Sequence, residues 1–324
     1  MANNHIISIE KPAKLSIDTG RLEINFIEKG EKHYFAPFDI AVLILAHTSI
    51  LLSSAVSKEL SNAGVAIVYV GDNYMPIGIT LPIGINLDGA KRPHLQAKYI
   101  NSNLTKPWWR QVIKSKILGQ ASVLEAFAKD ESQRLTTIAN KVIDGDDDNK
   151  EGQSARFYWD VFFGVLNKTV RKREKQGATD VINSSLNYAY AIIRSMVARS
   201  LVSAGLCLNL GIGHSRRDNP FNLVEDFIEP FRFVADKVIF EIFSDNDYES
   251  LNTVLKRELL SRILQEVVRV ENKNYRLFEA VDFMVDSFCN TLEDPRRKLL
   301  LPNMPTSRGV KMEMPELFHT KYEI

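Results

Sequence analysis

The sequence predicts an α+β fold, with a small β-rich domain at residues 1–92 followed by a larger all-α domain at residues 93–301. Early in the chain, short segments of alternating or β-branched apolar residues are broken by Gly and Pro, which is typical of strands joined by turns. Beyond these segments, apolar residues recur at helical spacing over long stretches. The 324 residues also exceed the comfortable size of one hydrophobic core, which favours two domains.

In the β-rich part, four short strands are expected first, and then two buried strands separated by a helix. Residues 39–47 (DIAVLILAH) and 65–72 (VAIVYVGD) are mostly apolar, which indicates fully buried strands. Residues 54–64 (SAVSKELSNAG) have a serine cap and a glycine exit, which predicts a short helix. Residues 76–84 (PIGITLPIG) have the Pro and Gly content of a connecting hairpin or loop. The four opening strands are expected at HIISI (5–9), KLSID (14–18), RLEINFI (21–27) and KHYFA (32–36).

The second domain is expected to consist of long amphipathic helices. Residues 302–324 contain Pro, Met and charged residues with weak periodicity, so we expect a mobile tail or a partner-binding arm there. The helices are expected within residues 94–104, 106–128, 132–143, 154–175, 181–206, 225–243 and 251–273.

Composition excludes some classes of protein and leaves others open. No apolar run reaches the roughly 18 residues that span a bilayer, and the N-terminus lacks the apolar core of a signal peptide, so we expect a cytoplasmic protein. Cys207 and Cys289 are expected to be buried thiols rather than a disulfide or a zinc site. The net charge is +1, but positive charge is concentrated in residues 168–175 (KTVRKREK) and 294–298 (DPRRK). Each run is either a solvated surface or a phosphate contact.

The chemistry of the chain is concentrated in residues 211–232 (GIGHSRRDNPFNLVEDFIEPFR), where His214 lies in a glycine loop ahead of an acidic helix. Asp226 and Glu229 are three residues apart and so share a helix face that also packs. Buried carboxylates are costly unless a charge compensates them. A divalent cation bound by the two carboxylates and the imidazole would do so, with Mg²⁺ or Mn²⁺ preferred and the imidazole favouring Mn²⁺. A lone histidine is, however, more often structural.

A third piece is the acidic loop and helix start at residues 145–159 (GDDDNKEGQSARFYW). Glu151 begins this helix and shares the face of Tyr158 and Phe162, so it is either a helix cap or a further ligand. Other chemistries lack their motifs: the sequence has no G-x-x-x-x-G-K-[ST] loop, no G-x-G-x-x-G after a strand, no H-E-x-x-H and no G-x-S-x-G.

Together, three segments resemble the CRISPR adaptation integrases, the metal-dependent nucleases that insert new spacers into CRISPR arrays. The resemblance extends over residues 5–300, and the order and spacing of the segments match. The form EDFIEPFR is most similar to members from type II-like systems with a single large effector nuclease. The matching segments are GDDDNKEGQSARFYW, INSSLNYAYAIIRSMVARSLVSAGLCLNLGIGH and NLVEDFIEPFR.

The resemblance implies that Glu151, His214 and Glu229 are the metal ligands and that Asp226 supports them. Glu225 is the alternative acidic residue, but its place in the motif is not that of the ligand. Further implied residues support the site or contact DNA, although Tyr188, like Tyr190, could equally be a core aromatic. The supporting candidates are Asn149, Asn187 and Tyr188, and the candidate DNA contacts are Arg156, Lys168, Arg171 and Arg173.

The resemblance also implies a reaction and a set of partners. A DNA 3′-hydroxyl attacks a phosphodiester at the repeat boundary, and the same site can hydrolyse branched DNA. Implied partners are double-stranded DNA, a second copy of the chain that dimerises through the N-terminal domain, and a small ferredoxin-like subunit that completes a heterohexamer. An effector nuclease is a further candidate partner. Two alternatives remain: a non-catalytic DNA-binding scaffold and a stand-alone branched-DNA repair nuclease.

Overall fold

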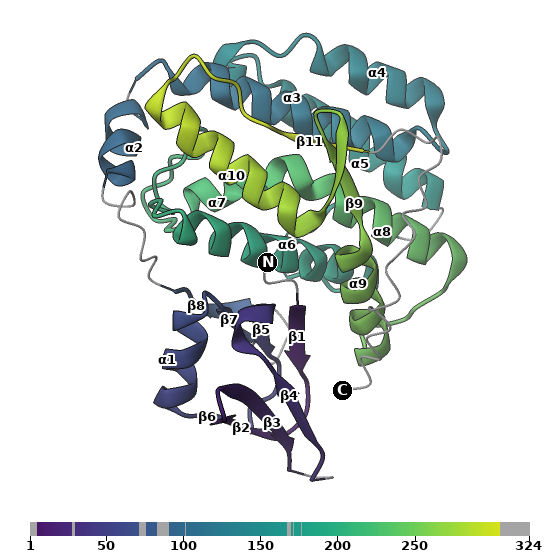
Figure 1. Ribbon diagram of the computed structural model, residues 1–324. Coiled ribbons are helices and arrows are strands. Elements are labelled where there is room, and N and C mark those ends of the chain that lie inside the picture. The colour runs from purple at the N-terminus through teal and green to yellow at the C-terminus, as the bar shows by residue number, and fades with distance from the viewer. Residues whose placement is uncertain are drawn as a thin grey trace.

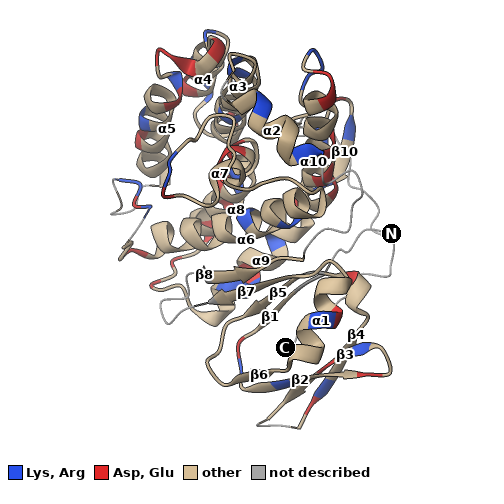
Figure 2. Cartoon of the chain, turned by 90° about the vertical axis from the view of Figure 1, so that its left-hand side faces the viewer, with Lys and Arg blue, Asp and Glu red and all other residues tan. Residues whose placement is uncertain are grey.

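The computed structural model describes residues 5–27, 30–70, 76–82, 91–100, 102–166, 170, 172–175 and 177–304. A β-rich N-terminal domain lies at one end of the molecule and a larger helical domain at the other, which confirms the predicted fold class (Figure 1). Acidic and basic residues are interspersed along both domains (Figure 2). No helix in the described part of the chain is both long and apolar enough to span a bilayer.

Two four-stranded sheets form the N-terminal domain, with strand orders β1-β5-β7-β8 and β4-β3-β2-β6. In the first sheet β1, β5 and β7 are parallel and β8 is antiparallel to β7, so the segment 76–84, predicted as a connecting hairpin or loop, includes a strand. Side chains of both sheets and of α1 share one core, which includes Leu43, Leu22 and Leu60. The strands are β1 (His5–Ile9), β2 (Ala13–Asp18), β3 (Arg21–Phe26), β4 (Lys32–Phe35), β5 (Ile40–Leu45), β6 (Ile50–Leu52), β7 (Ala66–Val70) and β8 (Pro76–Thr80), and α1 is Ser54–Asn62.

Both faces of β5 are buried, as its nearly continuous apolar sequence predicts. Leu43 and Leu45 belong to the core of the N-terminal domain, whereas Val42 and Ile44 belong to the core of the helical domain. β7 alternates in the same way. The Nε of Arg199 also donates to the carbonyl oxygen of Gly64 at 3.1 Å. The two domains are therefore packed together through one face of this sheet.

Long amphipathic helices form the second domain, with α6 buried among them along most of its length. The helix α10 was not among the predicted helices. The helices are α2 (Arg92–Ile100), α3 (Thr105–Leu124), α4 (Lys129–Ala139), α5 (Lys150–Leu166), α6 (Val181–Ser203), α7 (Asn222–Ile228), α8 (Arg232–Asp245), α9 (Thr253–Gln265) and α10 (Leu277–Glu293).

The helix predicted at residues 225–243 is broken in the middle. Helix α7 ends at Ile228, a 3₁₀ turn spans Glu229–Phe231, and α8 begins at Arg232. The break lies at Pro230, which lacks the N–H needed for an uninterrupted α-helix. Glu229 therefore lies at a junction rather than on a straight helix face.

The helix predicted at residues 251–273 is also shorter than expected. It ends at Gln265, and the β-branched sequence that follows forms β9 (Val267–Val270), paired with β10 (Lys273–Arg276). A third strand, β11 (Pro302–Asn303), pairs with the other edge of β9. A small sheet thus interrupts the domain expected to be all-α, and it takes up the first residues of the expected tail. Residues 305–324 lie outside the described residues.

Candidate metal centre

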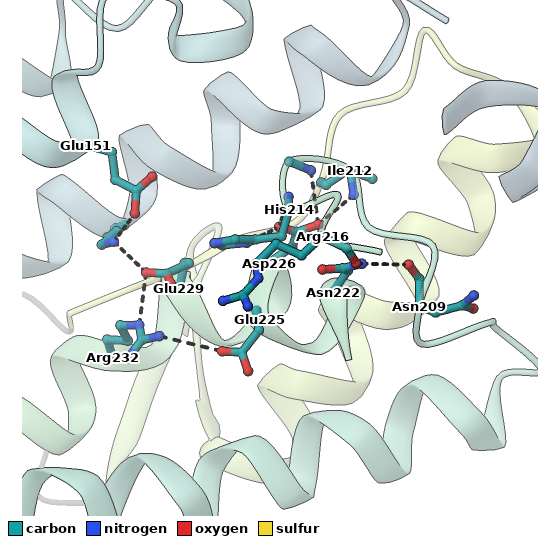
Figure 3. Close-up of polar contacts among 12 residues, drawn as sticks. Glu151, Asn209, Ile212, His214, Arg216, Asn222, Glu225, Asp226, Glu229 and Arg232 are labelled. Atoms are coloured by element: carbon teal, nitrogen blue, oxygen red, sulfur yellow. Dashed lines mark hydrogen bonds and ion pairs between the residues drawn. The ribbon is translucent and has the colours of Figure 1, made fainter. Parts of the chain in front are cut away.

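An ammonium group joins the two carboxylates predicted as metal ligands. The Nζ of Lys116, on α3, lies 2.6 Å from Oε1 of Glu151 and 2.7 Å from Oε2 of Glu229. Glu151 comes from the first turn of α5, and Glu229 from the 3₁₀ turn between α7 and α8. In Figure 3 both carboxylates are directed toward this position from opposite sides. The fold therefore brings two of the three predicted ligands together, with a cation already between them.

Glu229 is almost fully buried, with only 4% of its side chain exposed. Arg232, one turn later, donates its Nε to Oε2 of Glu229 at 2.9 Å. Burial alone would raise the pKa of Glu229, but the positive charges of Arg232 and Lys116 lower it to about 2. Burial would likewise lower the pKa of Lys116, but Glu229 and Glu151 raise it. Glu229, Lys116 and Arg232 therefore stay charged and stabilise one another.

Glu225, the alternative acidic residue, has different partners. It forms ion pairs with Arg194 on α6 and, at 3.9 Å, with the Nη2 of Arg232. Glu225 has no hydrogen bond or ion pair to Lys116 among the described contacts. Its geometry therefore supports the sequence-based choice of Glu229 over Glu225.

His214 is held by Asp226, which is fully buried. The Nδ1 of His214 lies 2.6 Å from Oδ1 of Asp226, and three consecutive backbone N–H groups, those of Ile212, Gly213 and His214, donate to the same carboxylate at 2.5, 3.1 and 2.9 Å. The loop therefore wraps around the Asp226 carboxylate, which fixes both the backbone and the ring of His214. Figure 3 shows the imidazole extending from Asp226 toward Glu229.

Two glycines let this loop approach its neighbours closely. A Cβ on Gly211 would lie 2.7 Å from Oδ2 of Asp226, and one on Gly213 would overlap the indole ring of Trp109. Trp109, on α3, packs edge-on against the His214 ring with centroids 5.5 Å apart. The glycines at these two positions are therefore required by packing rather than by an unusual backbone angle.

The pKa of His214 is raised above its usual value, chiefly by the hydrogen bond to Asp226 and despite partial burial. The negative charges of Asp226, Glu229 and Glu151 raise this pKa further. When Nδ1–H donates to Asp226, the other ring nitrogen, Nε2, remains available for a metal ion. An acidic residue that orients the histidine in this way is typical of metal sites.

The start of α5 is held by Asp146 and Asn149, of which only Asn149 is among the predicted site residues. Asp146, with a left-handed φ of 53°, accepts the backbone N–H groups of Lys150 and Glu151 at 2.8 and 2.9 Å. Asn149 accepts the N–H of Gly152 at 3.0 Å. Asn149 therefore caps the helix that carries Glu151 and has no contact with the other predicted ligands among the described hydrogen bonds. Asp146 could have been found from the run of acidic residues preceding the helix.

Arg173 is partly buried and is bonded to side chains of α6. Its Nη1 and Nη2 donate to Asn183 and Asn187 at 3.1 and 2.6 Å, and its guanidinium lies over the rings of Tyr190 and Trp159. These contacts fix the guanidinium against α6, and a phosphate contact by Arg173 stays a prediction. Asn187 supports Arg173 and not the carboxylates directly.

Of the remaining predicted residues, Tyr188 is buried and Arg156 is exposed. Tyr188 belongs to the hydrophobic core of the helical domain, as its alternative interpretation as a core aromatic predicts. Arg156 is exposed on α5, as a DNA contact must be. Lys168 and Arg171 lie outside the described residues.

A buried network behind the site is not among the features that the sequence predicts. Asp236 on α8 accepts hydrogen bonds from Tyr190 and, at 3.0 Å, from Tyr158. Burial raises the pKa of Asp236 to about 6, against the lowering effect of the two hydroxyls. Arg232 links this network to Glu229, because its guanidinium lies 4.6 Å from the centroid of the Tyr190 ring.

The predicted ligands are of the types that bind a divalent cation, but they are not arranged as a preformed metal site. Within the residues that the structure describes, no three His, Cys, Asp or Glu side chains are close enough together to hold a metal ion. Two carboxylates nevertheless share one ammonium, which marks a position that attracts cations, and Asp226 leaves one nitrogen of His214 available. A metal bound by all three side chains would have to replace the Lys116 ammonium.

Residues 7–267 of this chain match the family model described as "CRISPR associated protein Cas1". The chain belongs to the Cas1 family. A Cas1 relative from Neisseria meningitidis serogroup C, named CRISPR-associated endonuclease Cas1, is 31% identical over 293 residues, which cover 90% of this chain and 93% of the relative. This match extends beyond the segments on which the resemblance was based.

Solved structures share the Cas1 fold at lower identity. A casposase bound to integration product has a TM-score of 0.77 and 18% identity, with 96% of this chain and 95% of that chain covered. A chain of a Cas6-RT-Cas1–Cas2 complex has a TM-score of 0.76 and 14% identity, with 94% of this chain and 37% of that longer chain covered. At these identities the likeness shows the fold alone, and the family assignment rests on sequence.

Proposed function

We propose that this Cas1 family member is a metal-dependent DNA endonuclease and integrase that inserts new spacer DNA into a CRISPR array. The carrying observation is that Glu151 and Glu229, distant in sequence, meet at one cation while His214 is oriented toward them by Asp226. The named endonuclease relative and the casposase fold support the same class of reaction. A type II-like system remains our prediction for the subtype.

Each residue has a proposed part in holding the cation and the substrate. Glu151, Glu229 and His214 would bind Mg²⁺ or Mn²⁺, and Asp226 would keep the imidazole in the tautomer that leaves Nε2 unprotonated. Arg232 would offset the charge of the buried Glu229. Lys116, released from the carboxylates, would remain on α3 beside the site as a cation for an incoming phosphate. The bound ion would supply Lewis-acid polarisation of the phosphodiester and stabilise charge on the leaving oxygen.

The proposed reaction requires no covalent protein intermediate. A DNA 3′-hydroxyl oxygen forms a bond to the target phosphorus, and the bond from that phosphorus to the displaced strand's 3′ oxygen breaks. The attacking hydroxyl loses its proton to solvent, and the displaced oxygen takes up one. With water as the nucleophile, the same exchange is hydrolysis. The number of phosphodiester bonds is unchanged in the first case and falls by one in the second.

The proposed partners are double-stranded DNA, a second copy of the chain and a small ferredoxin-like subunit, together forming a heterohexamer. Support for the small subunit comes from the structural neighbour, which is part of a complex containing Cas1 and Cas2. Support for self-association through the N-terminal domain comes from large apolar side chains on its surface, since Phe38 is 69% exposed and Leu51 60% exposed.

Strand transfer by the purified protein tests the proposal. A labelled DNA duplex and a branched repeat-containing target are incubated with Mn²⁺, and the wild type is compared with Glu151→Ala, His214→Ala and Glu225→Ala. We expect at least a hundredfold loss in the first two variants and a much smaller loss in the third. Equal activity in the wild type, Glu151→Ala and His214→Ala would overturn the catalytic assignment and favour a DNA-binding scaffold. Cleavage of branched DNA without any strand transfer would favour a repair nuclease.

A further inference from the structure

A pocket of about 500 Å³ lies beside α3, formed with the end of α4 and the segment that follows α10. These elements lie in the part of the helical domain farther from the N-terminal domain (Figure 1). Five of its lining residues are Lys or Arg, and none is Asp or Glu. The lining residues are Pro107, Trp108, Arg110, Gln111, Lys114, Ala139, Asn140, Val142, Pro295, Arg296, Arg297 and Lys298. The pocket therefore attracts anions.

Three of the five cations have no ion-pair partner among the described residues. Arg110 pairs with Asp144 at 2.9 Å, and Arg296 pairs with its near neighbour Asp294 at 2.8 Å. Lys114, Arg297 and Lys298 form no such pair, and all three are exposed. Their positive charge is thus uncompensated within the described part of the molecule. This set includes two residues of the basic run DPRRK, which the proposed active site does not use.

The segment that carries Arg296 and Arg297 is held against α3 and α10 by hydrogen bonds. The backbone N–H of Leu299 donates to Oε1 of Gln111 at 3.1 Å, and that of Leu300 donates to Oγ of Ser287 at 2.9 Å. Further along, Oγ of Ser115 donates to the carbonyl oxygen of Pro302 at 3.1 Å. The backbone of the basic turn is therefore held in place before any ligand arrives, so binding need not order it.

The pocket is separate from the candidate metal centre, although α3 carries residues of both. Lys114 lines the pocket and Lys116 holds the carboxylates. Residues two apart on a helix differ in direction by about 200°. The two lysines thus project from opposite sides of α3. Arg296, Arg297 and Lys298 also lie beyond residues 7–267, the part of the chain that matches the family description.

We propose that this pocket binds the phosphodiester backbone of DNA, outside the active site. This inference rests on the proposed function, which supplies DNA as the substrate. The cations of the pocket are long side chains around an open hollow. This arrangement suits successive phosphates of a DNA backbone better than one enclosed phosphate ion. Most of the polar side chains that line the pocket are cations, and contacts to phosphate carry no base information, so the contact is independent of DNA sequence.

The test removes the three unpaired cations together, in Lys114→Ala/Arg297→Ala/Lys298→Ala. Its control removes three exposed lysines elsewhere, in Lys58→Ala/Lys129→Ala/Lys273→Ala, so the change in net charge is the same. Dissociation constants for two duplexes of unrelated sequence are measured by fluorescence anisotropy between about 50 and 200 mM salt. We expect the pocket variant to bind both duplexes at least tenfold more weakly at the lowest salt. The slope of log affinity against log salt should fall by about 2 to 3, since each lost phosphate contact contributes about 0.9.

The outcomes separate this proposal from the proposed function. DNA binding by the pocket variant equal to that of the control would overturn the pocket proposal, whatever the catalytic results. So would weakening for one duplex only, or calorimetric binding of inorganic pyrophosphate that the triple substitution abolishes while DNA binding is unchanged. Strong DNA binding that depends on the pocket, in a wild-type protein without Mn²⁺-dependent cleavage or strand transfer, would support the pocket and reject the proposed function.

Discussion

Oδ1 of Asp226 is hydrogen-bonded to both the ring and the backbone of His214, with Nδ1 at 2.6 Å and the backbone N–H at 2.9 Å. A single buried carboxylate therefore sets where the imidazole lies and which nitrogen it presents. Because two further N–H groups of the loop end on the same carboxylate, the position of the histidine and the stability of the loop depend on one residue.

We expect Asp226→Asn to lower both stability and metal affinity. An amide has one acceptor oxygen, and its NH₂ group would face N–H donors. The free energy of unfolding should therefore fall by about 1–3 kcal/mol. Loss of the carboxylate that orients the histidine should weaken Mn²⁺ binding about 10- to 100-fold. Urea unfolding and calorimetric titration measure these effects. The control is Asp218→Asn, at an exposed ion pair, which should change stability by less than about 0.5 kcal/mol. Equal effects of the two substitutions would contradict the role of Asp226.

Lys116→Met should destabilise the protein in the absence of divalent cations. The substitution leaves Glu151 and the buried Glu229 without their shared ammonium, and breaking a buried pair costs about 3–5 kcal/mol. Mn²⁺ should recover part of this loss, so the rise in Tm on adding Mn²⁺ should be larger in the variant than in the wild type. Thermal unfolding with and without Mn²⁺ checks this, with Lys114→Met as the exposed control on the same helix. An identical rise in all three proteins would show that the ammonium and the metal do not share a position.

Two glycines provide a matched pair of substitutions. Gly213→Ala should destabilise the protein and weaken Mn²⁺ binding, because the added Cβ would overlap Trp109 and displace the loop that carries His214. Gly164→Ala adds the same atom within α5, where nothing lies within 4 Å, so it should be neutral or stabilising by up to about 1 kcal/mol. Urea unfolding of both variants makes the comparison. If Gly213→Ala were as stable as Gly164→Ala, the loop would not be held against Trp109.

Glu229 should make the protein lose stability in acid. Its pKa is about 2 in the folded protein and near 4.5 when unfolded, so the unfolded chain binds the proton first as the pH falls. The contribution is fully present above about pH 4.5 and is lost as the pH falls through about 2; it amounts to about 3 kcal/mol. Urea unfolding across this pH range should therefore show a steeper decline for the wild type than for Glu229→Gln. Parallel declines would mean that Lys116 and Arg232 do not hold this carboxylate.

Metal affinity should distinguish the two nearby glutamates. Glu229→Gln should weaken Mn²⁺ binding more than Glu225→Gln, because Glu229 shares a cation with Glu151, whereas Glu225 is occupied by Arg194 and Arg232. Calorimetric titration of the two variants settles the order. The reverse order would mean that the ligand lies one turn earlier on α7.

The sequence predicts helices and strands well where one periodicity governs a long segment, as in α3 and α6. It fails where a local signal must compete with that pattern. Pro230 interrupts an otherwise continuous helical pattern, and the chain leaves the helix after Gln265 to form β9, whose partner β11 lies far along the sequence. Asn149 illustrates the same limit at the site, since its motif position gives no indication that it caps α5 instead of touching the ligands.

By itself, the sequence determined the fold class, the family and the three segments that carry the acidic residues and the histidine. Local propensity, apolar periodicity and motif order are properties of the chain, so they can be read without coordinates. Only the tertiary structure decided that Lys116 joins Glu151 to Glu229, that Arg173 is bonded to Asn183 and Asn187, and that basic residues near both ends of the helical domain form one pocket. Ion pairs of this kind depend on distances between segments that packing alone sets, and a buried lysine on an apolar helix has no local signal for its partner.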